Sequence, residues 1–170
     1  MSLDSLEKLF VEEVRDIYNA EKQLLRALPR MAKAAQSADL SQAFTKHLKE
    51  TEGHVQRLER IFRDLGQAVR GKQCKGMVGL IEEGKEKLEE KGEGAVLDAA
   101  LITSAQKVEH YEIAAYGCLR TYAQLLGYSQ AGKLLEQTLA EEEAADKKLT
   151  ELAEGGINDA AAAAGKEIEA

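Results

Sequence analysis

The sequence predicts an all-α protein, and three observations support this fold class. Alanine, leucine, glutamate, lysine and glutamine, all good helix formers, dominate the 170-residue chain, which has one proline and no tryptophan. β-Branched residues are scarce, and no alternating apolar run of strand length occurs. Apolar residues instead recur at steps of three and four over long stretches, as they do on the buried face of a helix.

Four long helices are predicted, over about residues 4–36, 39–65, 95–126 and 130–153. Asp4 with Glu7, and Asp39 with Gln42, have the spacing of capping boxes that begin the first two helices. Pro29 lies inside the first apolar stripe, so a kink or a break is expected about one turn before it. The buried stripe of the third helix is expected to contain Leu101, Ala105, Val108, Glu112, Ala115, Leu119, Tyr122 and Leu126.

The connections between these helices predict the topology. Short links join the first helix to the second and the third to the fourth, so each pair forms an antiparallel hairpin. The middle connection carries a shorter helix, "MVGLIEEGKEKLEE", and is long enough to run the length of the bundle. A four-helix bundle with one long crossover is the ferritin-like topology. We assign residues 1–154 to this bundle domain and residues 155–170 to a C-terminal tail that is flexible or docked.

Charge and composition exclude several kinds of function. The formal net charge of −7 argues against binding nucleic acid, because phosphate contacts need a basic face. The start, "MSLDSLEKLF", has neither the basic residues nor the apolar run of a signal peptide, and no stretch is apolar enough to cross a membrane, so we expect a cytoplasmic protein. Two cysteines are too few for a disulfide framework or a metal motif. Cys118 is expected to pack as a small apolar side chain, and Cys74 to lie in a loop.

Acidic residues occupy positions on these helices where core residues are expected. Glu21 in the first helix and Glu112 in the third fall among large apolar neighbours. The fourth helix directs two acids, one turn apart, toward its buried face, and the second helix places a histidine and a glutamate three residues apart. The predicted metal ligands are Glu21, His47, Glu50, Glu109, Glu112, Glu142 and Asp146.

These acids lie near the middle of their helices, so a bundle would bring them to one level. Burying one carboxylate without a partner costs several kcal/mol, and burying several together adds mutual repulsion. Few lysines or arginines lie on the same faces, so we expect two divalent metal ions, with iron as the first choice and manganese as the second. The ferritin-like spacing Glu-x-x-His is absent. Its absence weakens the choice of metal more than the prediction of a metal site. His54 and Glu141 are alternatives for one of the ligands, whereas His110 is expected outside the site.

Five blocks of sequence carry a family resemblance. They are "DIYNAEKQLLRALPRMAKAA" (16–35), "HLKETEGHVQRLE" (47–59), "GLIEE" (79–83), "DAALITSAQKVEHYEIAAYG" (98–117) and "LLEQTLAEEEAADKKLTELA" (134–153). On these blocks the chain resembles the YciE/YciF family of bacterial ferritin-like proteins, over nearly its whole length apart from the tail. The resemblance implies a ferritin-like bundle, a dinuclear metal site, a link to bacterial stress responses and a homodimer. It implies no settled reaction.

Three functions therefore compete. The first is a redox metalloprotein, a diiron-type oxidoreductase of ferroxidase or peroxidase character, whose partners are small oxidants such as dioxygen or peroxide. The second is a protein that binds metal without turnover, for buffering or for structure. The third is a helical interaction protein whose buried acids are protonated or paired.

Overall fold

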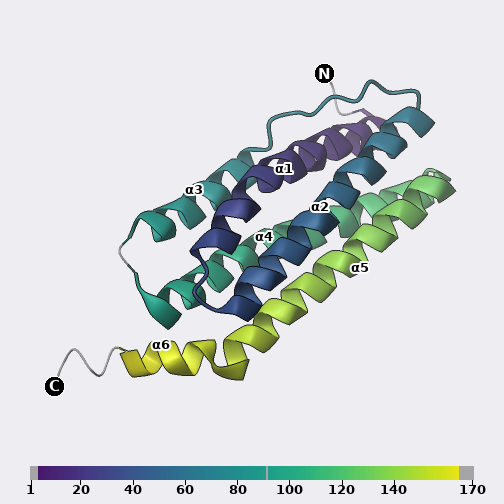
Figure 1. Cartoon of the computed structure of the whole chain (residues 1–170). Coiled ribbons are helices and arrows are strands. Elements are labelled where there is room, and N and C mark those ends of the chain that lie inside the picture. The colour runs from purple at the N-terminus through teal and green to yellow at the C-terminus, as the bar shows by residue number, and fades with distance from the viewer. Residues whose placement is uncertain (1–3, 91, 165–170) are drawn as a thin grey trace.

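The computed structural model describes residues 4–90 and 92–164, which are almost entirely helical (Figure 1). In chain order the helices are α1 (Leu6–Ala34), α2 (Ala38–Asp64), α3 (Lys75–Glu89), α4 (Gly94–Leu125), α5 (Ser129–Leu152) and α6 (Asn158–Ala164). The long helices α1, α2, α4 and α5 form the bundle, and α3 lies beside α1 and α4. The connection from α2 to α4, which carries α3, is the long crossover. The predicted fold class, a ferritin-like four-helix bundle with an extra helix in its crossover, is confirmed.

Serine side chains, rather than the predicted aspartates, cap the first two helices. The hydroxyls of Ser5 and Ser37 each accept a hydrogen bond from the backbone N–H three residues further on, at 3.2 Å and 3.3 Å. The predicted caps at Asp4 and Asp39 are therefore wrong. Asp39 lies inside the first turn of α2, where its negative charge still favours the helix by facing the positive end of the helix dipole.

Helix α1 continues through Pro29 to Ala34, so the predicted break is wrong. Pro29 itself is exposed, while Leu24 and Leu28 before it are buried. Met31 after it also packs against the core. The apolar face is thus anchored on both sides of the proline, and this packing outweighs the loss of one backbone hydrogen bond.

The buried face of α4 departs from the predicted stripe after Glu112. It continues through Tyr116 and Ala123, whereas Ala115 and Tyr122 are half-buried. The predicted stripe alternates steps of four and three, an average of 3.5 residues, whereas an α-helix has 3.6 residues per turn, so the predicted stripe drifts off the buried face. The shift by one position places Tyr116 in the core.

The two cysteines lie in different environments. Cys118 is exposed, so the expected packing of its side chain is wrong; it follows Tyr116 by two positions and therefore lies on the opposite side of α4. Cys74 directly precedes α3, where its thiol lies 2.9 Å from the hydroxyl of Tyr111. Tyr111 donates a hydrogen bond to Asp16 at 2.8 Å, which ties the crossover to α1 and α4.

The C-terminal segment packs against the bundle over the residues that the structure describes. After α5 a wide helical turn, Ala153–Ile157, redirects the chain, with Gly156 at a φ of 143° that only glycine adopts without strain. Helix α6 then lies against α4 across one end of the bundle (Figure 1). Of the predicted tail, residues 165–170 lie outside the described residues.

A search of the described helices finds none that combines the length and the apolar character needed to cross a membrane.

Asp98 joins the start of α4 to the start of α2 and generates the first testable prediction. Its carboxylate, 3% exposed, accepts hydrogen bonds from the backbone N–H groups of Gln36 and Ser37 at 2.7 Å and 2.8 Å. We expect Asp98→Ala to lower the free energy of unfolding, measured by urea denaturation, by about 2 kcal/mol, because two N–H groups lose a charged acceptor. Asp64→Ala removes an exposed aspartate whose ion pair with Arg60 spans 3.7 Å, and should change stability by less than about 0.5 kcal/mol. Equal effects of the two substitutions would contradict this role for Asp98.

Candidate metal centre

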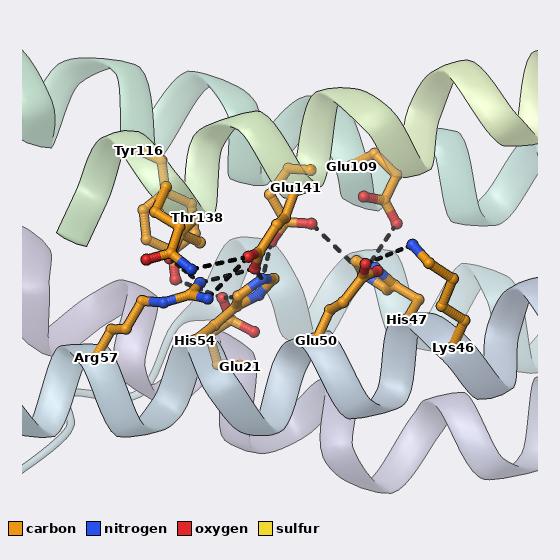
Figure 2. Close-up of polar contacts among 12 residues, drawn as sticks. Glu21, Lys46, His47, Glu50, His54, Arg57, Glu109, Tyr116, Thr138 and Glu141 are labelled. Carbon is orange, nitrogen blue, oxygen red and sulfur yellow. Dashed lines mark hydrogen bonds and ion pairs between the residues drawn. The ribbon is translucent and has the colours of Figure 1, made fainter. Parts of the chain in front are cut away.

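Six ionisable side chains from four helices meet in the middle of the bundle, and Figure 2 labels Glu21, His47, His54 and Glu109 among them. The helix stripes that form the hydrophobic core also position these groups, since each takes the place of a core residue. Each of the six is at most 5% exposed. They are Glu21 of α1, His47 and His54 of α2, Glu109 and Glu112 of α4, and Glu142 of α5.

One group of these side chains surrounds His47. The imidazole Nε2 of His47 lies 3.3 Å from Glu109 Oε1 and 3.5 Å from Glu142 Oε2. With Glu112 these residues offer four ligand atoms within 4.8 Å of one another, which is a spacing that a single metal ion can span.

A second group surrounds His54. Its Nδ1 lies 3.2 Å from Glu21 Oε1 and 3.1 Å from Glu142 Oε1, and one ligand atom from each of the three residues lies within 4.8 Å of the others. The hydroxyl of Tyr116 donates a hydrogen bond to Glu21. Glu142 belongs to both groups, with one carboxylate oxygen facing each histidine.

A hydrogen-bonded chain at the surface orients His54. Its Nε2 lies 3.0 Å from Glu141, which in turn accepts two hydrogen bonds from Arg57 at 2.7 Å and 2.8 Å. Burial alone would raise the pKa of Glu141, but the Arg57 guanidinium holds that pKa below its ordinary value. Because an ionised Glu141 accepts a hydrogen bond from Nε2–H, the geometry assigns the unprotonated nitrogen of a neutral His54 to Nδ1, inside the cluster.

Many polar atoms of the cluster have no hydrogen-bond partner. Buried polar atoms in folded proteins nearly always have hydrogen-bond partners, so a cluster of atoms that lack them needs an explanation. Both carboxylate oxygens of Glu112 and of Glu142 lack partners among the described residues. The other atoms without partners in the cluster are Glu21 Oε2, Glu109 Oε2, His47 Nδ1 and Nε2, His54 Nδ1 and Thr51 Oγ1. Carboxylate oxygens and imidazole nitrogens are the donors that iron, manganese and zinc accept, so the donor set fits divalent metal ions.

Without metal, burial shifts the protonation of the cluster. Burial, reinforced by neighbouring carboxylates, raises the pKa of Glu109 and of Glu112 well above the ordinary value, and it raises the pKa of Glu142 despite the opposing effect of His54. Burial lowers the pKa of His54, but Glu21 and Glu142 outweigh it and raise that pKa to about 11. The metal-free site therefore keeps protons that metal ions would replace.

The structure brings five of the seven predicted ligands together: Glu21, His47, Glu109, Glu112 and Glu142. Glu50 and Asp146 lie outside both groups. Glu50 pairs with Lys46 and lies 3.5 Å from His47 Nδ1, on the outer side of that ring. Asp146 accepts a hydrogen bond from Gln106 at 3.3 Å and lies 3.3 Å from the exposed ring of His110. A step of four residues turns a helix by about 40° beyond a full turn, which carries Asp146 from the buried face to its edge.

Two residues that contact the acids, His54 and Tyr116, are more central to the site than the sequence pattern predicts. His54 was only an alternative, although it follows His47 by seven residues, two helical turns, and so shares its face. Tyr116 was not considered, because the predicted stripe of its helix passed through Ala115. A strict 3.6-residue period starting at Glu112 would have found it.

Comparisons with known proteins agree with this fold. A profile of the family described as "Domain of unknown function (DUF892)" matches residues 5–162. Protein YciF of Escherichia coli is 47% identical over 159 residues, which cover 93% of this chain and 96% of YciF. The crystal structure of that stress protein matches with a TM-score of 0.88 over 92% of this chain and 99% of the other.

Two further solved structures are similar. YcfI of Rhodopseudomonas palustris, described as a proposed structural protein, is 44% identical with a TM-score of 0.85, over 88% of this chain and 97% of the other. A protein of Xanthomonas campestris, 19% identical, shares the fold with a TM-score of 0.70, over 89% of this chain and 92% of the other.

The protonation of the cluster generates a prediction about stability and pH in the metal-free protein. A group whose pKa is raised by folding stabilises the fold below its unfolded pKa and loses this effect as pH rises through its folded pKa. Glu109, Glu112 and Glu142, with unfolded pKa values of about 4.3, and His54, at about 6.5, all act in this direction. We therefore expect the free energy of unfolding in chelator to fall from pH 5 to pH 9, measured by urea denaturation.

Glu112→Gln tests the origin of that slope. The amide needs no proton to remain neutral, so the decline from pH 5 to pH 9 should become shallower. Glu143→Gln changes an exposed residue of the same helix as Glu142 and should leave the slope as it is. Stability of the wild-type chain that rises from pH 5 to pH 9 would contradict the protonation described.

Proposed function

Because the chain belongs to the DUF892 family and shares its bundle fold with the stress protein YciF, we propose that it is a stress-related metalloprotein with a dinuclear carboxylate site. One observation carries the proposal: the buried glutamates and histidines whose side chains have atoms without hydrogen-bond partners converge in two groups at the middle of the bundle. We propose iron as the metal, with manganese as the alternative, since both accept oxygen-rich ligands supplemented by imidazole.

Charge supports two ions rather than one. The four buried glutamates, when ionised, balance two divalent cations with both histidines neutral. A single divalent ion would leave two buried negative charges, or two protons still bound, at a cost of several kcal/mol. In the proposed site His47, Glu109 and Glu112 hold one ion, Glu21 and His54 hold the other, and Glu142 contacts both.

The surrounding residues would set the chemistry. Two bound iron ions supply electrons and open coordination positions to a small oxidant such as dioxygen or peroxide. The chain's own residues exclude bulk water, because the six cluster side chains are almost fully buried. Glu141 orients His54, and Tyr116 holds a proton at the hydroxyl oxygen that faces Glu21. Burial raises the pKa of Tyr116, so this proton remains in place at neutral pH.

A second candidate function is metal binding without turnover. The description of YcfI as a proposed structural protein favours it, since that protein shares 44% of its sequence with this chain. Both candidates need the same metal site and differ in reactivity toward oxidants. A homodimer, which the family resemblance implies, is also part of the proposal and can be tested by sedimentation.

Metal content is the first experiment. The chain, purified without oxygen and equilibrated with Fe(II), should bind about two ions per chain. Glu142→Gln should reduce this number to below one, because the lost carboxylate contacts both ions. The neighbouring exposed variant Glu143→Gln should retain full binding. Full binding by Glu142→Gln would contradict the assigned ligands, and no binding by the wild-type chain would contradict the site itself.

Reactivity separates the two candidates. The Fe(II)-loaded chain is prepared without oxygen and is then mixed with a solution of dioxygen or hydrogen peroxide, while absorbance is followed by stopped flow. Rapid oxidation of the bound iron, faster than that of free Fe(II) in the same buffer, supports the redox function. Stable Fe(II) binding without accelerated oxidation would leave metal binding for buffering or structure.

A further inference from the structure

A small cavity leads from the surface between α2 and α5 toward the His47 side of the cluster. Its volume is about 40 Å³, and its walls include two cluster members, His47 and Glu109. Alanines, the smallest side chains after glycine, form part of its rim on both helices: Ala43 on α2 and Ala144 and Ala145 on α5. The cavity, whose walls also include Lys46, Lys148 and apolar side chains, therefore reaches a pair of candidate ligands.

Glu50 lies in the wall of this cavity, outside the cluster. Its side chain is 21% exposed and pairs with Lys46, whose side chain is 70% exposed. On its inner side Glu50 lies 3.5 Å from Nδ1 of His47, while Nε2 of the same ring faces Glu109 at 3.3 Å (Figure 2). A single imidazole thus connects a carboxylate in the cavity wall with the carboxylates inside.

On the same α2–α5 side of the bundle, the surface next to His54, at the other end of the cluster, is closed. There Arg57 holds Glu141 through two hydrogen bonds and also donates to Thr138 at 3.0 Å. A planar guanidinium that donates three hydrogen bonds to two residues opens less readily than an exposed lysine that contacts one carboxylate oxygen. Of the two ends, the one next to His47 is the easier to open.

We propose that divalent cations reach the buried site through this cavity, and that Glu50 binds them first and passes them to His47 and Glu109. This inference rests on the proposed function. Lys46 neutralises Glu50 in the absence of metal. An arriving divalent ion, with twice the charge, displaces the ammonium group, exchanges part of its water shell for the Glu50 carboxylate and moves inward as His47 and Glu109 replace Glu50. Glu50 is thus an access residue and not one of the final ligands.

The test measures how fast Co(II), a coloured probe of carboxylate and imidazole sites, enters the metal-free full-length chain in a stopped-flow instrument. Glu50→Gln should slow binding about tenfold, as expected for the loss of a focusing charge, and should leave the final number of bound ions unchanged. Glu89→Gln removes a carboxylate from the exposed Lys85–Glu89 pair, which has the same four-residue spacing on α3. That control should bind Co(II) at the wild-type rate.

Two further variants separate local from general effects of charge. Lys46→Gln should accelerate binding, because it removes the competing ammonium group, whereas Lys85→Gln, an equal change of net charge, should not. Ala144→Leu changes no charge and narrows the rim of the cavity, so it should slow binding. Ala140→Leu, on an exposed position one turn earlier in α5, is its control.

Three results would overturn the inference. Wild-type rates in both Glu50→Gln and Ala144→Leu would show that ions arrive elsewhere, although the metal site stands. Loss of a bound ion in Glu50→Gln would make Glu50 a permanent ligand. Equal slowing by Glu50→Gln and Glu89→Gln would assign the effect to net charge. Failure of the wild-type chain to bind Co(II), Fe(II) or Mn(II) at all would instead contradict the proposed function, and the access route with it.

Discussion

The cost of removing four carboxylates and two imidazoles from water dominates the middle of this protein. Hydrophobic packing can assemble the bundle, but it cannot compensate several unpaired charges placed within hydrogen-bonding distance of one another. In the metal-free chain burial raises the pKa values of Glu109, Glu112 and Glu142, so these groups retain protons and avoid part of this cost. Two divalent cations would meet it with the acids ionised. If the proposed metal ions bind, the exchange of protons for metal would link the stability of the bundle to its function.

The topology supplies what such a site needs. Each long helix extends the apolar core on both sides of the cluster, so the polar groups lie at the level farthest from the helix ends. The crossover helix α3 covers the α1–α4 side of the bundle, and Cys74 and Met77 at its start are completely buried. The α2–α5 side differs along its length, since an arginine closes it near His54 and an exposed lysine covers it near His47. A rigid bundle in which the Lys46–Glu50 contact can open would suit a metal site that is loaded after folding.

Much of this arrangement follows from the sequence. The four helices, the crossover and the presence of Glu21, Glu112 and Glu142 on buried faces can be predicted, because a charged residue among large apolar neighbours is a strong signal over a long helix. The direction of a side chain near the edge of a stripe is harder to predict, since each step of one residue along a helix turns that direction by about 100°. This limit explains why the sequence pattern places Asp146 within the cluster although it lies at the edge. It also explains why the pattern does not identify Tyr116. Pairings between helices, such as that of Arg57 on α2 with Glu141 on α5, depend on how the helices pack and cannot be predicted from one stripe.

Anomalous diffraction from crystals of the full chain soaked in Fe(II) or Mn(II) tests the dinuclear centre most directly. We expect two anomalous peaks in the middle of the bundle, one among His47, Glu109, Glu112 and Glu142 and the other among Glu21, His54 and Glu142. Peaks confined to the surface, with the buried acids unchanged at saturating metal, would contradict the proposal that these residues form a metal centre.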